Sequence, residues 1–221
     1  MKCYSYKYFD VYHGSSNIVF VVAHAGKLRP KRMWYSRCSP GADLNTDKIA
    51  FTAAEHIYNE TKKRPWIFYV KIHRAFVDMN CPPSLYIDRK KNLSIHFYFF
   101  LVFERMLKWL AKKYKSVFVF DIHGFVDTEG GYDIIFGTQK FKTVKKKKYL
   151  LSFVNYLGRK GYSVGIDAEG YLGFYIILRA SHYADAVQVE IEARWRNGSE
   201  ETRNKFATDF AQGIINFYPI Q

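Results

Sequence analysis

The sequence predicts an α/β fold in which helices cover both faces of a central sheet. Short runs of β-branched and aromatic residues alternate along the chain with longer amphipathic stretches, an order typical of strands and helices in turn. Several of the short runs are apolar on both alternating sets of positions, as expected for strands that are covered on two faces. Hydrophobic residues make up 48% of the 221 residues and no Pro/Gly/Ser-rich linker interrupts them. We therefore expect one domain over residues 1–221.

The predicted elements follow from these local patterns. The strands are the β-branched and aromatic runs Asn17–Ala23, Trp66–Ile72, Ser116–Ile122, Tyr132–Phe136, Gly173–Leu178 and Ala186–Ile191. The helices are the amphipathic stretches Thr46–Glu60, Leu93–Lys115, Lys145–Arg159 and Glu200–Phe217. The first of these helices opens with Thr and Asp, which suit a helix start, and the second is long.

The chain is strongly basic, with 34 Lys and Arg against 20 Asp and Glu and a net charge of +14. Such a balance attracts polyanions or carboxylate-rich substrates. The two densest basic runs, Lys108–Lys115 and Lys140–Lys148, fall on predicted helices or helix entrances, and we interpret them as solvated faces. Because Phe and Tyr occur mostly inside apolar runs and not among the basic residues, nucleic-acid binding is the weaker interpretation.

The three cysteines Cys3, Cys38 and Cys81 are an odd number without CxxC spacing. This pattern argues against a disulfide framework and against a thiolate metal cage. No apolar run reaches the roughly 18 to 20 residues of a membrane span, and the first residues lack the apolar stretch of a secretory signal. We expect a cytoplasmic chain without a membrane span. The pattern does not predict an oligomeric state.

The candidates for chemistry are polar residues at the ends of predicted strands, where α/β sheets usually bind ligands. The first strand leads to His24, the third leads to His123, and the last contains Glu190. Two histidines and one carboxylate are typical ligands of a zinc hydrolase. A lone histidine is more often structural, but two at the ends of different strands, each followed by small residues, bring a metal site close to equal footing with the structural interpretation. Without an HExxH motif, spacing alone leaves the ligand set open.

Five segments form an ordered set of motifs. They are Val21–Gly26 (VVAHAG), Asn45–Asp47 (NTD), His73–Pro82 (HRAFVDMNCP), Phe120–Gly124 (FDIHG), and Gly173–Ile176 (GFYI) with Ala186–Glu190 (AVQVE). In this order they resemble motifs of the N-formylglutamate amidohydrolase family, distant relatives of the zinc carboxypeptidases. The resemblance implies a phosphorylase/hydrolase-like fold, as in zinc exopeptidases, with a mixed central sheet.

The resemblance also implies a set of zinc ligands. His24 and His123 would hold one zinc ion per chain. Asp47 would be the third ligand, with Asp43 as the alternative, because a Thr-Asp pair at a helix start is also a good N-cap. Asp78 would accept a hydrogen bond from the free ring nitrogen of His24 and thereby fix its tautomer.

Catalytic and substrate-binding residues follow from the same resemblance. Glu190 would be the general base, and a carboxylate in an apolar run would be costly to bury without such a partner. Glu192 shares its strand face, so orientation alone does not exclude it. Asn80 would help to hold a substrate carboxylate. Arg74 and Arg179 would polarise the scissile carbonyl or pair with substrate carboxylates, unless they are ordinary surface arginines.

The sequence departs from the family motifs at several positions. Ala23 and Ala25 replace the Pro and Ser that flank the first histidine, and Phe174 replaces the second Gly of its motif. Cys81 stands where the family has an arginine, which in the related carboxypeptidases clamps a terminal carboxylate. Because a cysteine cannot form that bidentate pair, formylglutamate itself is in doubt as the substrate.

We therefore predict a zinc-dependent amidohydrolase or carboxypeptidase-like enzyme. Its substrate would be a small acidic amide or peptide, such as a glutamyl-like or N-acyl amino acid compound, with which the positive net charge is compatible. The departures from the motifs suggest an alternative, a catalytically inactive family member that acts as a binding protein.

Overall fold

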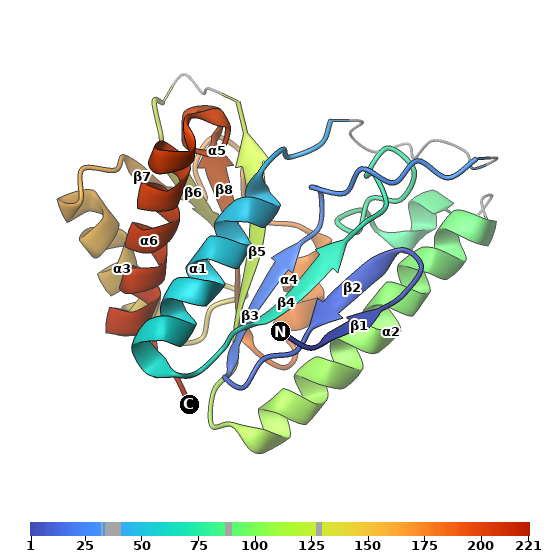
Figure 1. The fold of residues 1–221 in the computed structure, drawn as a ribbon, viewed down its shortest axis with the longest axis horizontal. Helices are drawn as coiled ribbons and strands as arrows, with labels where there is room; N and C mark the ends of the chain where they lie inside the picture. The colour runs from blue at the N-terminus through green and yellow to red at the C-terminus, as the bar shows by residue number, and fades with distance from the viewer. Residues whose placement is uncertain (32, 34–40, 87–89, 127–129) are drawn as a thin grey trace.

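The structure is a computed structural model that describes residues 1–31, 33, 41–86, 90–126 and 130–221. Within these ranges an eight-stranded sheet with the order β1-β2-β4-β3-β5-β8-β6-β7 forms the centre (Figure 1). The strands are β1 Cys3–Ser5, β2 Phe9–Tyr12, β3 Ile18–Val22, β4 Trp66–Val70, β5 Phe118–Phe125, β6 Ile134–Gly137, β7 Val164–Ile166 and β8 Asp185–Glu192.

The sheet is mixed, as expected. The central strands β4, β3, β5 and β8 are parallel to one another, and β6 with β7 forms a second parallel pair. Antiparallel pairing joins β1 to β2, β2 to β4 and β6 to β8. Because the four central strands run in one direction, their carboxyl ends meet at one edge of the sheet.

Helices cover both faces of the sheet, which confirms the predicted α/β architecture (Figure 1). They are α1 Thr46–Thr61, the 3₁₀ turn η1 Pro83–Tyr86, α2 Lys90–Lys113, α3 Lys147–Arg159, α4 Tyr175–Ala180, α5 Ala193–Asn197 and α6 Glu200–Phe217. Buried residues of α1, α3 and α6 pack on one face, and those of α2 and α4 pack on the other.

The two cores are separated by the alternation of side chains along each strand. On β5, Phe118, Phe120 and Ile122 point into the core below α1 and α6. Val119 points into the opposite core, below α2 and α4. By the same alternation, the side chains of Asp121, His123 and Phe125 lie on the α2/α4 side of the sheet.

The predicted strand Gly173–Leu178 is wrong, because Tyr175–Ala180 form helix α4. A short apolar run fits either a covered strand or a buried helix, and periodicity cannot separate the two. Gly173 has a φ of 86°, in the left-handed region that favours glycine, and this conformation turns the chain before the helix begins. The sequence patterns also missed β1, β2, β7 and α5, all of which are five residues or shorter.

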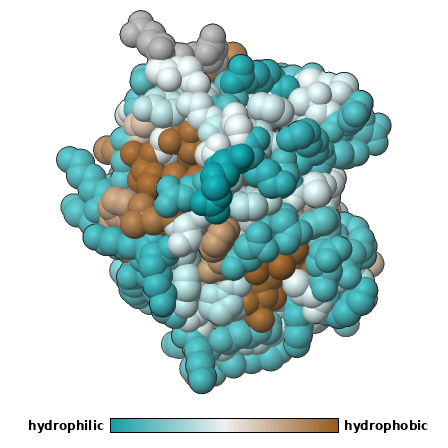
Figure 2. Space-filling view, turned by 90° about the vertical axis from the view of Figure 1, so that its left-hand side faces the viewer, coloured by the Kyte–Doolittle hydropathy of each residue, from teal (hydrophilic) through white to brown (hydrophobic). Residues whose placement is uncertain are grey.

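The basic run before and within α3 is solvent-facing, which confirms its interpretation as a solvated face. Its exposed lysines are Lys140, Lys142, Lys145, Lys146, Lys147 and Lys148. Figure 2 looks onto the side of the molecule where α3 lies and shows a mostly hydrophilic surface around two separate hydrophobic areas. Among the helices that the structure describes, none combines the length and apolar composition of a membrane span.

Phe120 tests how far stability depends on the core below α1 and α6. Its ring is 1% exposed and lies 5.9 Å from the ring of Phe210 and 5.2 Å from that of Tyr218, between centroids. We expect Phe120→Ala to lower the free energy of unfolding by about 3–5 kcal/mol in urea denaturation. The control Leu151→Ala, at a side chain that is 44% exposed, should change it by roughly 0.5 kcal/mol or less. Equal losses in both variants would contradict the assigned core.

Candidate metal centre

The parallel pairing of β3, β5 and β8 brings sequence-distant polar residues together. In the register of β5 with β8, His123 stands opposite Glu190 and Asp121 stands opposite Gln188. All four side chains lie on the α2/α4 side of the sheet by the alternation described above. His24 follows the end of β3, which pairs with β5 on its other side. The predicted strand-end residues therefore share one edge.

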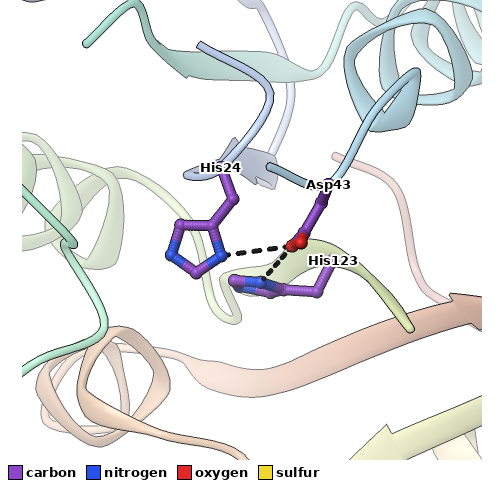
Figure 3. A group of neighbouring side chains, drawn as sticks. All are labelled: His24, Asp43 and His123. Carbon is purple, nitrogen blue, oxygen red and sulfur yellow. Dashed lines mark hydrogen bonds and ion pairs between the residues drawn. The ribbon is translucent and has the colours of Figure 1, made fainter. Parts of the chain in front are cut away.

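The structure brings His24 and His123 together around a carboxylate. Nδ1 of His24 and Nδ1 of His123 each lie 3.1 Å from the same oxygen of Asp43, Oδ2. Figure 3 shows the two imidazole rings and the carboxylate directed toward one another. All three residues are buried, and their candidate ligand atoms lie within 4.8 Å of one another. Two imidazole nitrogens and a carboxylate oxygen at this spacing fit a catalytic zinc site with an open fourth position.

The outer ring nitrogens of both histidines also face carboxylates. Nε2 of His24 lies 2.7 Å from Oδ1 of Asp78, the contact that the sequence motifs led us to expect. Nε2 of His123 lies 2.8 Å from Oδ2 of Asp121 and 3.0 Å from the side-chain nitrogen of Asn80. Carboxylates at these positions orient imidazole rings, so that the opposite nitrogen is directed at a metal.

The carboxylate beside the histidines belongs to Asp43, the alternative ligand, and not to Asp47. Asp43 precedes α1, where its carbonyl oxygen accepts a hydrogen bond from the hydroxyl of Thr46 at 2.8 Å, and its own backbone N–H donates to the carbonyl of His24 at 3.1 Å. Asp47 lies one residue inside α1 and lines a different cavity, beside Arg203. The preference for Asp47 is therefore corrected. The Asn45–Asp47 motif indicates where the third ligand lies along the sequence, but it does not show where helix α1 begins.

Glu190 lies beside the cluster, and Glu192 does not. The side-chain amide of Gln188 donates a hydrogen bond to Oε1 of Glu190 at 2.5 Å, and its oxygen accepts one from the backbone N–H of Phe174 at 3.0 Å. Burial raises the pKa of Glu190, against the charge of the nearby His123. Glu192 instead caps α5 by accepting a hydrogen bond from the backbone N–H of Arg194 at 2.8 Å.

The two candidate arginines lie in different places. Arg74 lines the same cavity as the cluster. Its Nη2 lies 2.8 Å from Oδ2 of Asp78, and its Nη1 lies 3.3 Å from Oδ1 of Asp43. Arg179 forms an ion pair with Glu104 and is not among the residues that line the cavity. The structure therefore does not bring Arg179 to the cluster.

A cavity of about 500 Å³ adjoins the cluster. Asn80 lines it, although its side-chain oxygen already accepts a hydrogen bond from the backbone N–H of Ile176 at 3.1 Å. The apolar and aromatic residues of its wall include Phe125, Val126, Tyr171 and Phe174. The cavity therefore combines a polar floor with a partly apolar wall, as small-molecule sites commonly do.

Cys81 also lines the cavity and is disulfide-bonded. A single bridge is not the disulfide framework against which the odd number of cysteines argues. Cys3 is an exposed free thiol, and Cys38 lies outside the described residues. A bonded cysteine cannot supply the positive charge of the motif arginine that it replaces.

Sequence reasoning assigned no role to Asp121, Gln188 or Arg196. The first two could have been found, because each lies two residues before a site residue on the same strand and therefore faces the same side. Arg196 is 5% exposed and lines the cavity. Nothing in the sequence separates it from the other arginines.

Burial and charge act against each other within the cluster. Burial lowers the pKa of His24, but the carboxylates of Asp78 and Asp43 outweigh it, and the net pKa lies above 6.5. Burial likewise lowers the pKa of His123, while Asp121 and Asp43 raise it well above 6.5. Burial raises the pKa of Asp43, but hydrogen bonds from both imidazoles hold it well below 3.8. Without a metal, the cluster therefore favours protonated imidazoles beside ionised carboxylates.

Comparison with known proteins gives structural matches alone. No family model and no curated protein sequence matches the chain. The crystal structure of N-formylglutamate amidohydrolase from Ralstonia eutropha JMP134 matches with a TM-score of 0.72 at 14% identity, over 95% of this chain and 96% of that one. A gene product of Agrobacterium tumefaciens matches with a TM-score of 0.71 at 13% identity, over 95% and 94% of the two chains.

A bacteriophage poly-gamma-glutamate hydrolase is a more distant structural match, with a TM-score of 0.53 at 14% identity over 96% of this chain and 90% of that one. At such identities the matches demonstrate a shared fold. The expected resemblance to N-formylglutamate amidohydrolases is therefore confirmed in the fold.

The raised histidine pKa values predict how the stability of the metal-free protein varies with pH. A histidine whose pKa is higher in the folded state stabilises the fold fully below its unfolded value of about 6.5, and this contribution is lost as the pH rises through the folded value. We expect the thermal midpoint, measured with a chelator, to fall as the pH rises above 6.5. His123→Gln should flatten this dependence, whereas His182→Gln, at an exposed residue, should preserve it. A wild-type midpoint that rises over this range would contradict the assignment.

Proposed function

We propose that the chain is a metal-dependent amidohydrolase whose single zinc ion is held by His24, Asp43 and His123. The observation that carries this proposal is the buried convergence of both Nδ1 atoms on one oxygen of Asp43. Three such ligands leave a position open for water, as in catalytic zinc sites. The fold shared with an N-formylglutamate amidohydrolase and a poly-gamma-glutamate hydrolase supports cleavage of C–N bonds.

Asp78 completes the proposed site by accepting a hydrogen bond from the outer ring nitrogen of His24, and Asp121 places a carboxylate 2.8 Å from that of His123. The hydrogen bond from Nε2 of His24 to Asp78 would fix the tautomer that leaves Nδ1 of His24 free as a ligand atom. Asp43 replaces Asp47 as the proposed third ligand, because Asp43 is the carboxylate that lies with both rings.

Glu190 is the proposed general base. When bound, zinc supplies Lewis-acid chemistry that makes water nucleophilic near neutral pH. Glu190 accepts the proton of the attacking water and delivers it to the leaving nitrogen. Its burial raises its pKa toward the working pH of a general base. The hydrogen bond from Gln188 fixes the orientation of its carboxylate.

Arg74 is the proposed cation for the scissile carbonyl, since it lines the cavity and lies next to the metal ligand Asp43. Asn80 lines the same cavity and remains the proposed contact for a polar group of the substrate. Arg179 is not proposed as a substrate ligand, because its ion pair with Glu104 holds it elsewhere.

A small acidic amide, such as an N-acyl glutamate or a γ-glutamyl peptide, is the proposed substrate class. Two observations support this class. The net charge of +14 attracts acidic compounds, and two structural neighbours are named as hydrolases of glutamate compounds. The alternative of an inactive binding protein rests on Ala25, Cys81 and Phe174. The presence of both the ligand set and Glu190 favours the enzyme.

Metal analysis tests the ligand set. We expect about one zinc ion per chain in protein purified without chelators. Asp43→Asn should weaken zinc binding strongly, because it removes a charged ligand, as measured by calorimetric titration. Asp47→Asn is the matched control and should bind zinc like the wild type. An empty wild-type protein that does not take up added zinc would favour the binding-protein alternative.

Turnover tests the role of Glu190. We expect Glu190→Gln to lower kcat by roughly 10²–10⁴-fold, the usual contribution of a general base, on N-acyl glutamates and γ-glutamyl peptides. Zinc content should stay at the wild-type level. Glu192→Gln is the control, because a glutamine can still accept the hydrogen bond that caps α5. Undiminished turnover in Glu190→Gln with zinc bound would reject the role.

A further inference from the structure

Arg196 occupies an unusual position for an arginine, because its guanidinium is buried beside the proposed active site. It lies in α5, the short helix that follows β8, and is 5% exposed. It lines the same cavity as His24, Asp43 and His123. A buried arginine is costly unless its N–H groups are satisfied and its charge is compensated.

Three backbone carbonyls satisfy the guanidinium of Arg196. Nε donates to the carbonyl of Ile191 at 2.8 Å, Nη1 donates to that of Leu44 at 2.9 Å, and Nη2 donates to that of Phe125 at 2.8 Å. All three nitrogens of one planar group are therefore used at the same time. Three otherwise separate segments of the backbone converge on it.

Each of these carbonyls follows a residue of the proposed site. Leu44 comes directly after the ligand Asp43, and Ile191 comes directly after Glu190. Phe125 lies two residues after His123, on the same strand. The guanidinium thus links the segment before α1, the end of β5 and the end of β8, which carry two proposed ligands and the general base.

The neighbouring sequence accommodates this arrangement. A Cβ atom at Gly124 would lie 2.2 Å from Cζ of Arg196, so only glycine lets β5 pass this close to the guanidinium. Gly124, the small residue after His123, therefore leaves the space that the guanidinium of Arg196 occupies. A second contact ties α5 to the segment before α1, where the side chains of Asn45 and Asn197 form a hydrogen bond of 3.0 Å.

We propose that Arg196 is a positioning residue, whose three hydrogen bonds hold the segments of Asp43, His123 and Glu190 at fixed distances from one another. The effect of Arg196 on zinc binding and turnover rests on the proposed function. Its effect on the positions of the three segments does not. Only a planar group with donors on three nitrogens can make these contacts. The single ammonium of a lysine cannot reach all three carbonyls.

Hydrogen–deuterium exchange of the metal-free protein tests the hold directly. We expect Arg196→Lys to accelerate exchange together in residues 41–46, 123–126 and 190–193. The matched control Arg194→Lys changes an arginine of the same helix whose side chain is 62% exposed, and it should leave these segments unchanged. Exchange at wild-type rates in residues 41–46 and 123–126 of Arg196→Lys would overturn the proposal.

Zinc affinity and kinetics test the consequence. We expect Arg196→Lys to weaken zinc binding by about 10–100-fold, as the loss of groups that orient metal ligands usually does. At saturating zinc, kcat should fall while KM stays near its wild-type value. In Arg196→Ala, millimolar guanidinium, far below denaturing concentrations, should restore part of the zinc affinity and of the exchange protection, which a merely structural defect would not show.

The outcomes separate this proposal from the proposed function. If the wild type binds no zinc, the function fails, and the exchange experiment still decides the role of Arg196. If the wild type binds zinc and turns over substrate while Arg196→Lys matches it in exchange and affinity, the function stands and the positioning role fails. If Arg196→Ala does not fold, the lysine variant carries the test.

Discussion

The parallel pairing of β5 with β3 on one side and β8 on the other is the constraint on which the site depends. It sets His123 opposite Glu190 and places His24 at the neighbouring strand end. Because parallel strands end at the same edge and side chains alternate between faces, these groups meet without any local sequence motif. The two hydrophobic cores pack against the two faces of this sheet. The polar residues of the site lie at the carboxyl ends of the central strands, beyond these cores.

Concentrating so many ionisable groups in a buried site is unfavourable unless each has a partner. The imidazoles of His24 and His123 lie between carboxylates on both ring nitrogens. Such an arrangement is compensated either by protons on the rings or by a divalent cation between them. A metal bound there would release protons from the rings, and the same carboxylates that favour protonation would orient the rings for it.

Two chains can share this fold although most of their residues differ. The match to an N-formylglutamate amidohydrolase extends over nearly the whole chain at 14% identity. The core can change in this way because many apolar combinations fill the same volume. Cys81, which lines the cavity, is a disulfide-bonded cysteine at the position of the motif arginine. In the proposed enzyme, substrate specificity would depend on the cavity wall and on Arg74, and the reaction would depend on the ligand set and Glu190.

The sequence alone determined the α/β class, the positions of the central strands and the histidines at their ends, because apolar periodicity and strand-end polarity are local properties. Tertiary structure decided the rest. Asp43 precedes α1 and Asp47 lies inside it, and only the fold shows that Asp43 is the carboxylate beside both histidines. The apolar run near Gly173 is helix α4, whose buried residues share one core with those of α2, and its local pattern fits a strand equally well. Three backbone carbonyls from segments far apart in the sequence accept hydrogen bonds from Arg196. No local sequence pattern predicts such a set of contacts.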